Sequence, residues 1–270
     1  MEWVAAYLAL GAIVGFLAGL FGIGGGLVLV PVLSFLFELQ QLTGHENLHL
    51  LALGTSMAAI LLSALVSSYT HYRHGAVQMT IVRILTPGLL LGTALGTLVA
   101  SHIDPGYLMI FFALFVCWAA LQMLLDIKPQ PARPLPGAAA MIGVGTGIGA
   151  VSSLVSIGGG TVSVPFLLYH NITLRHAIGT SAALGLPIAV GGTMGYIATG
   201  WAIPALPSNS LGFVYVPAWI CVALGSVLTV PAGAWATYHL PIKWLRRGFA
   251  ILLFLLALRM IWQAWANWHE

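Results

Sequence analysis

Two glycine-rich blocks contain the residues whose types and spacing best suit a chemical role. Residues 22–31 read GIGGGLVLVP and residues 156–165 read SIGGGTVSVP, with Ile, three Gly, two Val and Pro at matching places. Glycine permits left-handed and tight backbone conformations, and it lets a ligand approach the main chain closely. A helix that starts after such a run presents free amides and the positive end of its dipole, which together attract an anion. We therefore predict backbone donors at Gly24, Gly25, Gly26, Gly158, Gly159 and Gly160.

A hydroxyl-bearing block follows each glycine run, LALGTS at 51–56 and HAIGTS at 176–181. These blocks are predicted to add hydroxyl donors to the same anion from Thr55, Ser56, Thr180 and Ser181. The alternative is that each hydroxyl bonds the preceding turn of its own helix, as hydroxyls in membrane helices commonly do. Three serines just before the second glycine run are further candidates, namely Ser152, Ser153 and Ser156.

Two ionisable side chains are further candidates for contact with the anion. His176 opens the second hydroxyl block and can assist the approach of the anion or carry a proton, with a plain helix-start contact as the alternative. Arg259 lies deep in an apolar segment, where a planar guanidinium suits a sulfonate or a carboxylate. Its alternatives are a polar pair across helices, snorkelling, or a cation–π contact with Trp262. The matching position in the first half is the neutral Gln122.

A rival interpretation comes from HENLH at 45–49, which matches the H-E-x-x-H spacing of zinc peptidases. Asp104 falls on the same predicted face as a third ligand, which would make the protein a membrane metalloprotease. The match lies in a predicted loop that has no counterpart in the second half. Cys117 and Cys221 are isolated in apolar runs, so they predict neither a disulfide nor a metal site. We therefore expect no metal, no cofactor and no enzymatic activity.

The composition of the chain indicates that it lies in a membrane. Hydrophobic residues make up 60% of it and charged residues 6%, and the mean hydropathy is +1.00, which is far outside the range of soluble domains. The opening MEWVAAYLALGAIV contains no Lys or Arg, so it is predicted to be a first span and not a signal peptide. In a membrane protein a net charge of +3 reports loops near acidic lipid. The expected partners are the lipid bilayer and a small anion, with no nucleic acid.

The glycine and hydroxyl blocks belong to a longer internal repeat. ALGT at 94–97 matches ALGS at 223–226, and ALQML at 120–124 matches ALRMI at 257–261, in the same order as the first two pairs. Such self-similarity predicts a duplicated structural unit. The predicted halves are residues 1–127 and 137–270, joined by a Pro-rich cytoplasmic linker at 128–136.

The apolar segments predict how the two halves cross the bilayer, because a span needs about 20 residues. The predicted spans are 48–69, 84–101, 107–125, 177–198, 211–232 and 248–268. Residues 4–37 and 138–170 are too long for one span, and their glycines divide each into about 18 to 20 residues and a remnant of about 10 to 12. If each is one long helix, both halves have the same orientation. If each folds back at its glycines, the second half is inverted.

The distribution of basic residues favours the hairpins. With hairpins, eight basic residues share one face, whereas long helices divide the eight equally between two faces. The hairpins also place five acidic residues on the opposite face, namely Glu2, Glu38, Glu46, Asp104 and Glu270. The eight are Arg73, Arg83, Lys128, Arg133, Arg175, Lys243, Arg246 and Arg247. We predict an all-α integral membrane protein of two inverted repeats, each with a glycine-broken helical hairpin and three transmembrane helices. The basic face is expected in the cytoplasm and both termini outside it.

The doubled GIGGG-x-V-x-VP block, with an AxGTS-like block after each copy, resembles the TauE/SafE family of membrane transporters, often called sulfite exporters. The resemblance covers nearly the whole chain. It implies transport of sulfite, a sulfonate, sulfoacetate or a similar anion across a bacterial inner membrane, with binding near the midplane between the two breaks. SIGGG in place of GIGGG predicts unequal half-sites. A passive anion channel and a scaffold without transport are the alternatives, and a homodimer is left open.

Overall fold

The computed structural model describes residues 2–21, 25–125, 133–239 and 242–267, which form ten helices and one small sheet. The helices are α1 (Glu2–Phe21), α2 (Gly26–Leu39), α3 (His45–Arg73), α4 (Met79–Ala100), α5 (Pro105–Leu125), α6 (Ala138–Val155), α7 (Gly160–Tyr169), α8 (Leu174–Gly200), α9 (Val216–His239) and α10 (Ile242–Asn267). Strands β1 (Ser210–Leu211) and β2 (Val214–Tyr215) pair in antiparallel fashion. The predicted all-α class is confirmed.

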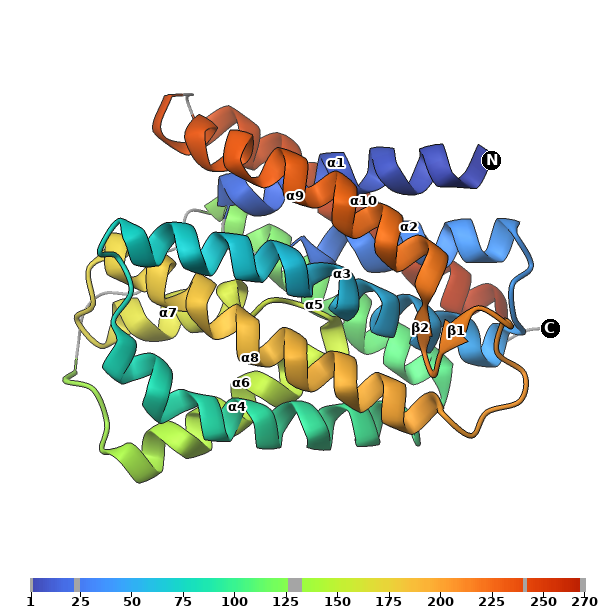
Figure 1. Ribbon diagram of the computed structural model, residues 1–270, viewed down its shortest axis with the longest axis horizontal. Coiled ribbons are helices and arrows are strands. Elements are labelled where there is room, and N and C mark those ends of the chain that lie inside the picture. The colour runs from blue at the N-terminus through green and yellow to red at the C-terminus, as the bar shows by residue number, and fades with distance from the viewer. Residues whose placement is uncertain (1, 22–24, 126–132, 240–241, 268–270) are drawn as a thin grey trace.

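Each half of the chain contains the same series of elements: a helix just long enough to cross a bilayer, a short helix after a glycine run, and three long helices. Helices α1 and α6 have 20 and 18 residues, whereas α2 and α7 have 14 and 10. Figure 1 shows α1 beginning at the right-hand end of the molecule and α6 at the left-hand end. The inverted-repeat relation stays a prediction, as do the boundaries at 127 and 137.

Helices α3 and α8 form the centre of the molecule, where they pack against each other and run in opposite directions (Figure 1). Helix α9 packs on α3 and α4 packs on α8, while α1 lies against α9, α6 against α4, and α5 against α10. Leu53, Met57, Leu184 and Ile188 of the central pair are completely buried. The core is therefore built between the two halves of the chain and not within each.

Seven helices among the described residues are long and apolar enough to cross a bilayer, namely α1, α3, α4, α5, α6, α8 and α9. The predicted span 211–232 begins too early. Residues 210–215 instead form the β1–β2 hairpin, whose turn contains Gly212 with φ 53°, and the helix starts at Val216. An apolar run cannot by itself separate a short buried strand from the start of a helix.

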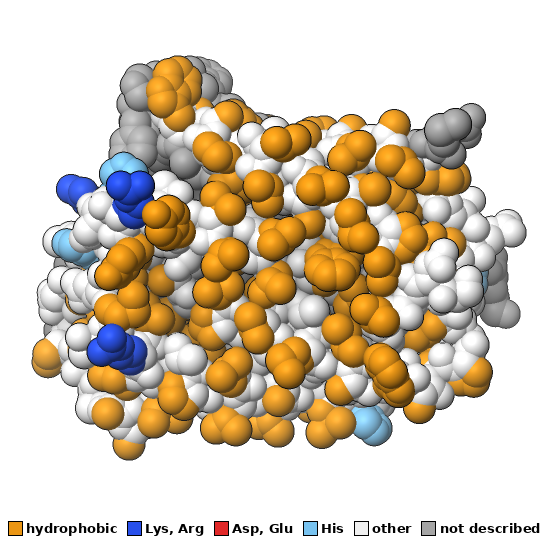
Figure 2. Space-filling view, in the orientation of Figure 1, with side chains coloured by type: hydrophobic (Ala, Val, Ile, Leu, Met, Phe, Trp, Pro, Cys, Tyr) orange, Lys and Arg blue, Asp and Glu red, His pale blue; other side chains and the backbone are white. Residues whose placement is uncertain are grey.

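Charged residues separate toward the two ends of the molecule. On the face in Figure 2, the Lys and Arg side chains gather at the left-hand end, where α3 ends and α8 begins. Helix α2 ends and α3 begins at the opposite end, which carries Glu38 and Glu46 close to the first described residues (Figure 1). Hydrophobic side chains are spread over the surface between the ends in Figure 2. Large apolar side chains are exposed on several helices, and Leu228 of α9 is 79% exposed. Such a surface suits contact with lipid acyl chains.

Candidate functional site

The two short helices begin at the predicted glycine breaks, after a residue in the left-handed region. Gly25 precedes α2 with φ 73° and Gly159 precedes α7 with φ 81°. In each break the carbonyl of this glycine accepts the amides three and four residues later, at 3.2 Å in the first break and at 3.1 and 2.8 Å in the second. A residue with a side chain is strained at a positive φ, so glycine is needed at both positions.

The two breaks touch each other in the interior of the molecule. A Cβ atom added to Gly26 would lie 1.6 Å from the carbonyl oxygen of Ser156, which is itself left-handed with φ 52°. The Ser156 hydroxyl donates to the carbonyl of Leu53 on α3, at 3.0 Å. The main chains of the breaks therefore meet beside α3, and Gly24 lies outside the described residues.

Both short helices start with buried amides that have no acceptor. The amides of Gly26 and Leu27 in α2, and of Gly160 and Thr161 in α7, donate to no atom of the described residues. The first turn of a helix always leaves such donors, and water normally satisfies them. Because these lie inside the protein, they form two facing donor groups with the positive ends of two helix dipoles.

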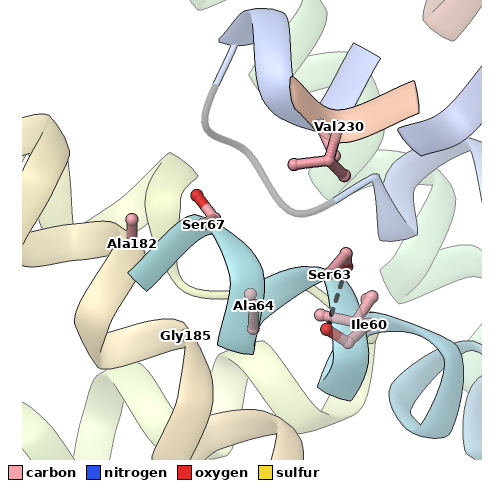
Figure 3. A pocket seen from close by; sticks show the side chains of 9 residues that line it. Ile60, Ser63, Ala64, Ser67, Ala182, Gly185 and Val230 are labelled. Atoms are coloured by element: carbon pink, nitrogen blue, oxygen red, sulfur yellow. Dashed lines mark hydrogen bonds between the residues drawn. The ribbon is translucent and has the colours of Figure 1, made fainter. Parts of the chain in front are cut away.

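A small cavity lies beside the second break, between α3 and α8 (Figure 3). Its volume of about 20 Å³ is enough for about one water molecule. Gly158 of the break, the end of α1 and one residue of α9 complete its wall. The lining residues are Ala18, Ile60, Ser63, Ala64, Ser67, Gly158, Ala182, Gly185 and Val230. Ser63 and Ser67 were not predicted from the sequence, although their spacing places them with Ser56 on one face of a helix.

Helices α3 and α8 are in close contact on the other side of the break. A Cβ added to Gly54 would lie 2.2 Å from the Phe213 carbonyl oxygen and 3.0 Å from Cβ of Tyr196, and one added to Gly192 would lie 2.9 Å from the Met57 sulfur. The interface between the central helices therefore has a cavity on the side of the end where the Lys and Arg side chains gather, which we call the basic end. It is tightly packed on the side of the opposite end, where α3 begins.

The threonines of the two hydroxyl blocks hold the starts of other helices. Thr55 Oγ1 donates to the Leu51 carbonyl at 2.6 Å and accepts the amide of Tyr215, just before α9, at 3.0 Å. Thr180 Oγ1 accepts the amide of Gln78, just before α4, at 3.0 Å. Each bond joins one half of the chain to the other. The sequence did not indicate these partners, because they lie more than 100 residues away.

The serines of these blocks differ from each other. Ser181 Oγ lies 2.8 Å from Ser163 Oγ of α7, and Ser163 donates to the Gly159 carbonyl at 2.6 Å. Ser56 is completely buried and its hydroxyl has no hydrogen-bond partner. In the aligned glycine blocks Ser163 corresponds to Leu29, so the first break lacks the matching hydroxyl.

His176 and Arg259 lie apart from the breaks. His176 Nδ1 is 3.3 Å from the Ala76 carbonyl oxygen, at the basic end. Arg259 is on the exposed side of α10, with its guanidinium carbon 3.9 Å from the ring centre of Phe35 on α2. This geometry is the cation–π alternative, with a different ring from the Trp262 that was expected.

The basic end carries a second hollow near the end of α3, lined by Tyr69, Thr70, Arg73 and His74. Arg175 of α8 lies beside it and donates to the His74 carbonyl at 2.9 Å. The basic sequence around 71–74 and the pair at 175–176 are therefore brought together. They lie near the end of α3, on the same side of the break as the cavity residue Ser67.

The HENLH segment forms the first turn of α3, so its prediction as a loop was wrong. His45 is exposed, whereas His49 is 1% exposed and packs edge-on against Phe112 at 5.7 Å. Neither ring nitrogen of His49 has a hydrogen-bond partner. No group of three His, Cys, Asp or Glu among the described residues is arranged to hold a metal ion. The motif therefore gains no support as a zinc site.

Comparisons with known proteins agree on one family. The model of the sulfite exporter TauE/SafE family matches residues 7–260. A probable membrane transporter protein of Haemophilus influenzae is 38% identical over 255 residues, which cover 94% of this chain and 96% of that protein. The probable membrane transporter proteins YdhB of Bacillus subtilis and MJ0441 of Methanocaldococcus jannaschii are 28% and 25% identical, over 70% and 83% of this chain and 77% and 80% of their own lengths. No solved structure matches the chain.

These matches agree with the helices long enough to span a bilayer and with the apolar surface between the charged ends. The relatives are named as transporters and not as enzymes, and the family match covers the glycine breaks, both hydroxyl blocks and all but the first and last few residues. The protein is thus a multi-pass membrane transporter, and the chain belongs to the sulfite exporter TauE/SafE family.

Proposed function

We propose that the protein transports a small oxyanion, such as sulfite, a sulfonate or sulfoacetate, across the inner membrane of a bacterium. The observation that carries this proposal is the meeting of two left-handed glycine breaks, with Gly26 against Ser156, inside a bundle of spanning helices. Backbone that leaves the helix within a bilayer must be satisfied by protein or line a polar space. Free amides at two facing helix starts are a favourable place for an anion.

The unequal packing of α3 and α8 favours a transporter with alternating access over a passive channel. The cavity lies on one side of the break, and the other side is filled by Met57, Tyr196 and Phe213, which are all completely buried. Transporters built from inverted repeats exchange an open and a closed side by rocking one group of helices against the other. We infer that the present arrangement is nearer to the state open toward the basic end, because the cavity lies on that side of the break.

The basic end is where we expect the anion to enter the protein. Arg73 and Arg175 lie there with the half-buried His176, around the hollow at the end of α3. A group of like charges raises the local concentration of an oppositely charged ligand. The positive-inside rule assigns this end to the cytoplasm, which puts both termini outside it. Loading from this end is consistent with export.

Stabilisation of the detergent-purified protein by anions tests the proposal. The panel is sulfite, sulfate, sulfoacetate, methanesulfonate, taurine and short carboxylates, each over a range of concentrations. Gly159→Ala is the site variant and Gly75→Ala its matched control, because Gly75 is also left-handed, with φ 66°, but has no atom within 4 Å of an added Cβ. Both variants carry the same kind of backbone strain, and only Gly159 belongs to a break.

We expect one anion class to raise the unfolding temperature of the parent protein and of Gly75→Ala, but not of Gly159→Ala. The same anion is then expected to be carried into proteoliposomes with saturable kinetics. If no anion in the panel shifts the transition, the proposed site is wrong. Flux that does not saturate with anion concentration would favour the channel.

A further inference from the structure

Buried hydroxyls in this protein share one hydrogen-bonding pattern, with a few exceptions. Most of those in long helices donate to a carbonyl three or four residues earlier, as Thr55, Ser63, Thr97 and Ser226 do. Five buried helical hydroxyls among the described residues have no partner: Ser34, Ser56, Ser152, Thr161 and Thr193. A buried hydroxyl without a partner costs free energy, so it needs an explanation. Three of the five lie at the second glycine break.

These three hydroxyls approach the break from three helices. Ser152 is in the last turn of α6, and its carbonyl accepts the amide of Ile157 at 2.9 Å. Thr161 is the second residue of α7. Ser56 lies one turn along α3 from Leu53, whose carbonyl accepts a hydrogen bond from the Ser156 hydroxyl. The exposed fractions of the Ser152, Thr161 and Ser56 side chains are 1%, 8% and 0%. Ser152 and Thr161 therefore flank the break along the chain, and Ser56 is three residues from the residue of α3 that the break contacts.

The backbone between them supplies a second set of donors. The four consecutive amides from Gly158 to Thr161 donate to no atom of the described residues, although all four residues are buried. Buried amides without partners are rare, and successive ones form the concave anion sites known as nests. Four amides and three hydroxyls supply as many neutral donors as one small oxyanion can accept.

The first break does not offer the same set. In the register of the repeated blocks Thr161 corresponds to Leu27, the second residue of α2, and Ser152 corresponds to Ala18. The side of the first break that meets the second is Gly26, which lies against the Ser156 carbonyl. The first half therefore contributes backbone and the hydroxyl of Ser56, while the other side-chain donors come from the second half.

The donors also limit the charge of the ligand. No Lys or Arg is buried among the residues whose side chains the structure describes. The dipole of one helix is equivalent to about half a positive charge at its N-terminus, so it offsets a single negative charge better than a double one. We propose that the anion is held unequally, by the second break, through the amides of 158–161 and the hydroxyls of Ser56, Ser152 and Thr161. We also propose that the site selects a singly charged oxyanion, which among the anions named above means hydrogensulfite or a simple sulfonate and not the doubly charged sulfoacetate. This inference rests on the proposed function.

Matched variants test the assignment. Thr161→Val and Ser152→Ala remove one hydroxyl each. Ser34→Ala is the control, because the Ser34 hydroxyl is also buried and unpaired but lies eight residues along α2 from its start at Gly26. Anion affinity is measured by thermal shift with methanesulfonate and with sulfate at equal ionic strength. We expect the first two variants to bind methanesulfonate about tenfold more weakly than the parent, since each loses a hydrogen bond to a charged group. Ser34→Ala is expected to bind methanesulfonate as the parent does, and sulfate is expected to bind the parent more weakly than methanesulfonate does.

The stability of the anion-free protein separates a binding role from a structural one. If the Thr161 hydroxyl is reserved for the anion, its loss raises the unfolding temperature without anion while it lowers the affinity. Parent-like affinity in both Thr161→Val and Ser152→Ala would overturn the assignment, and tighter binding of sulfate would overturn the charge selection. If the parent responds to no anion in the larger panel, the proposed function fails and this inference fails with it.

Discussion

Replacement of Gly26 by alanine is the sharpest probe of the contact between the two breaks. An added Cβ would lie 1.6 Å from the Ser156 carbonyl oxygen, 2.8 Å from its carbonyl carbon and 3.1 Å from Ile60 Cδ1. Gly26 lies within α2 and outside the left-handed region, so alanine causes no conformational strain there. The substitution therefore tests steric contact alone, which a change at Gly25 would not do.

The size of the effect follows from these distances. Side-chain carbons essentially never approach another atom closer than 3.0 Å, so the backbone at Ser156 must move by at least about 1.4 Å, the difference between 3.0 and 1.6 Å. The obstacle is main chain, which cannot rotate aside. Overpacking of this kind costs about 1 to 3 kcal/mol. The displacement also separates the two donor groups, so we expect anion affinity to fall by at least about tenfold, because the donors no longer converge.

Unfolding in detergent and uptake into proteoliposomes measure the two effects. Gly147→Ala is the control, since Gly147 is an exposed position inside α6 with no atom within 4 Å of an added Cβ. That change is expected to stabilise the helix by about 0.5 to 1 kcal/mol and to leave transport intact. If Gly26→Ala unfolds at the parent temperature and transports at the parent rate, the two breaks are not in contact and the reasoning is refuted.

Three further outcomes are expected. Thr55→Val and Thr180→Val are each expected to lose about 1 to 3 kcal/mol of stability, because an amide at a helix start loses its acceptor, and to leave anion affinity unchanged. Thermal unfolding with and without anion measures both quantities. A loss of affinity without a loss of stability would favour the threonines as ligands. Arg259→Gln keeps parental flux, since the guanidinium packs on Phe35 and away from the breaks; loss of flux at normal expression counts against this placement. His49→Leu raises the unfolding temperature, because two unpaired buried nitrogens are removed; a fall would indicate that the ring has a partner.

The sequence predicted the breaks well because glycine acts locally. A GGG run in an apolar segment interrupts a helix whatever surrounds it, so the starts of α2 and α7 at Gly26 and Gly160 could be placed from residue types alone. The all-α class followed from composition, because a bilayer admits few other structures. The residues with unusual backbone needs were thus the easiest to predict.

The roles of side chains were harder to predict because they depend on the rotation of a helix about its axis. Helix α10 is apolar on every side, so no periodicity shows which way Arg259 points. The partner of Thr55 lies 160 residues away and that of Thr180 lies 102 residues away. Such contacts are decided by tertiary packing. The segment 45–49 was assigned to a loop because it lacks a repeat partner, yet it continues α3 by one turn.

The hydrogen bonds that Thr55 and Thr180 accept from the other half of the chain have a consequence for biosynthesis. Thr55 emerges from the ribosome long before Tyr215, so α3 must wait in the membrane for most of translation before it holds the start of α9. Domains of a nascent chain generally fold in order, N-terminal first. Here the first half cannot be completed in that order. Its final form depends on the last helices to be inserted, and the period before their arrival is when quality-control proteases have access to the unfinished chain.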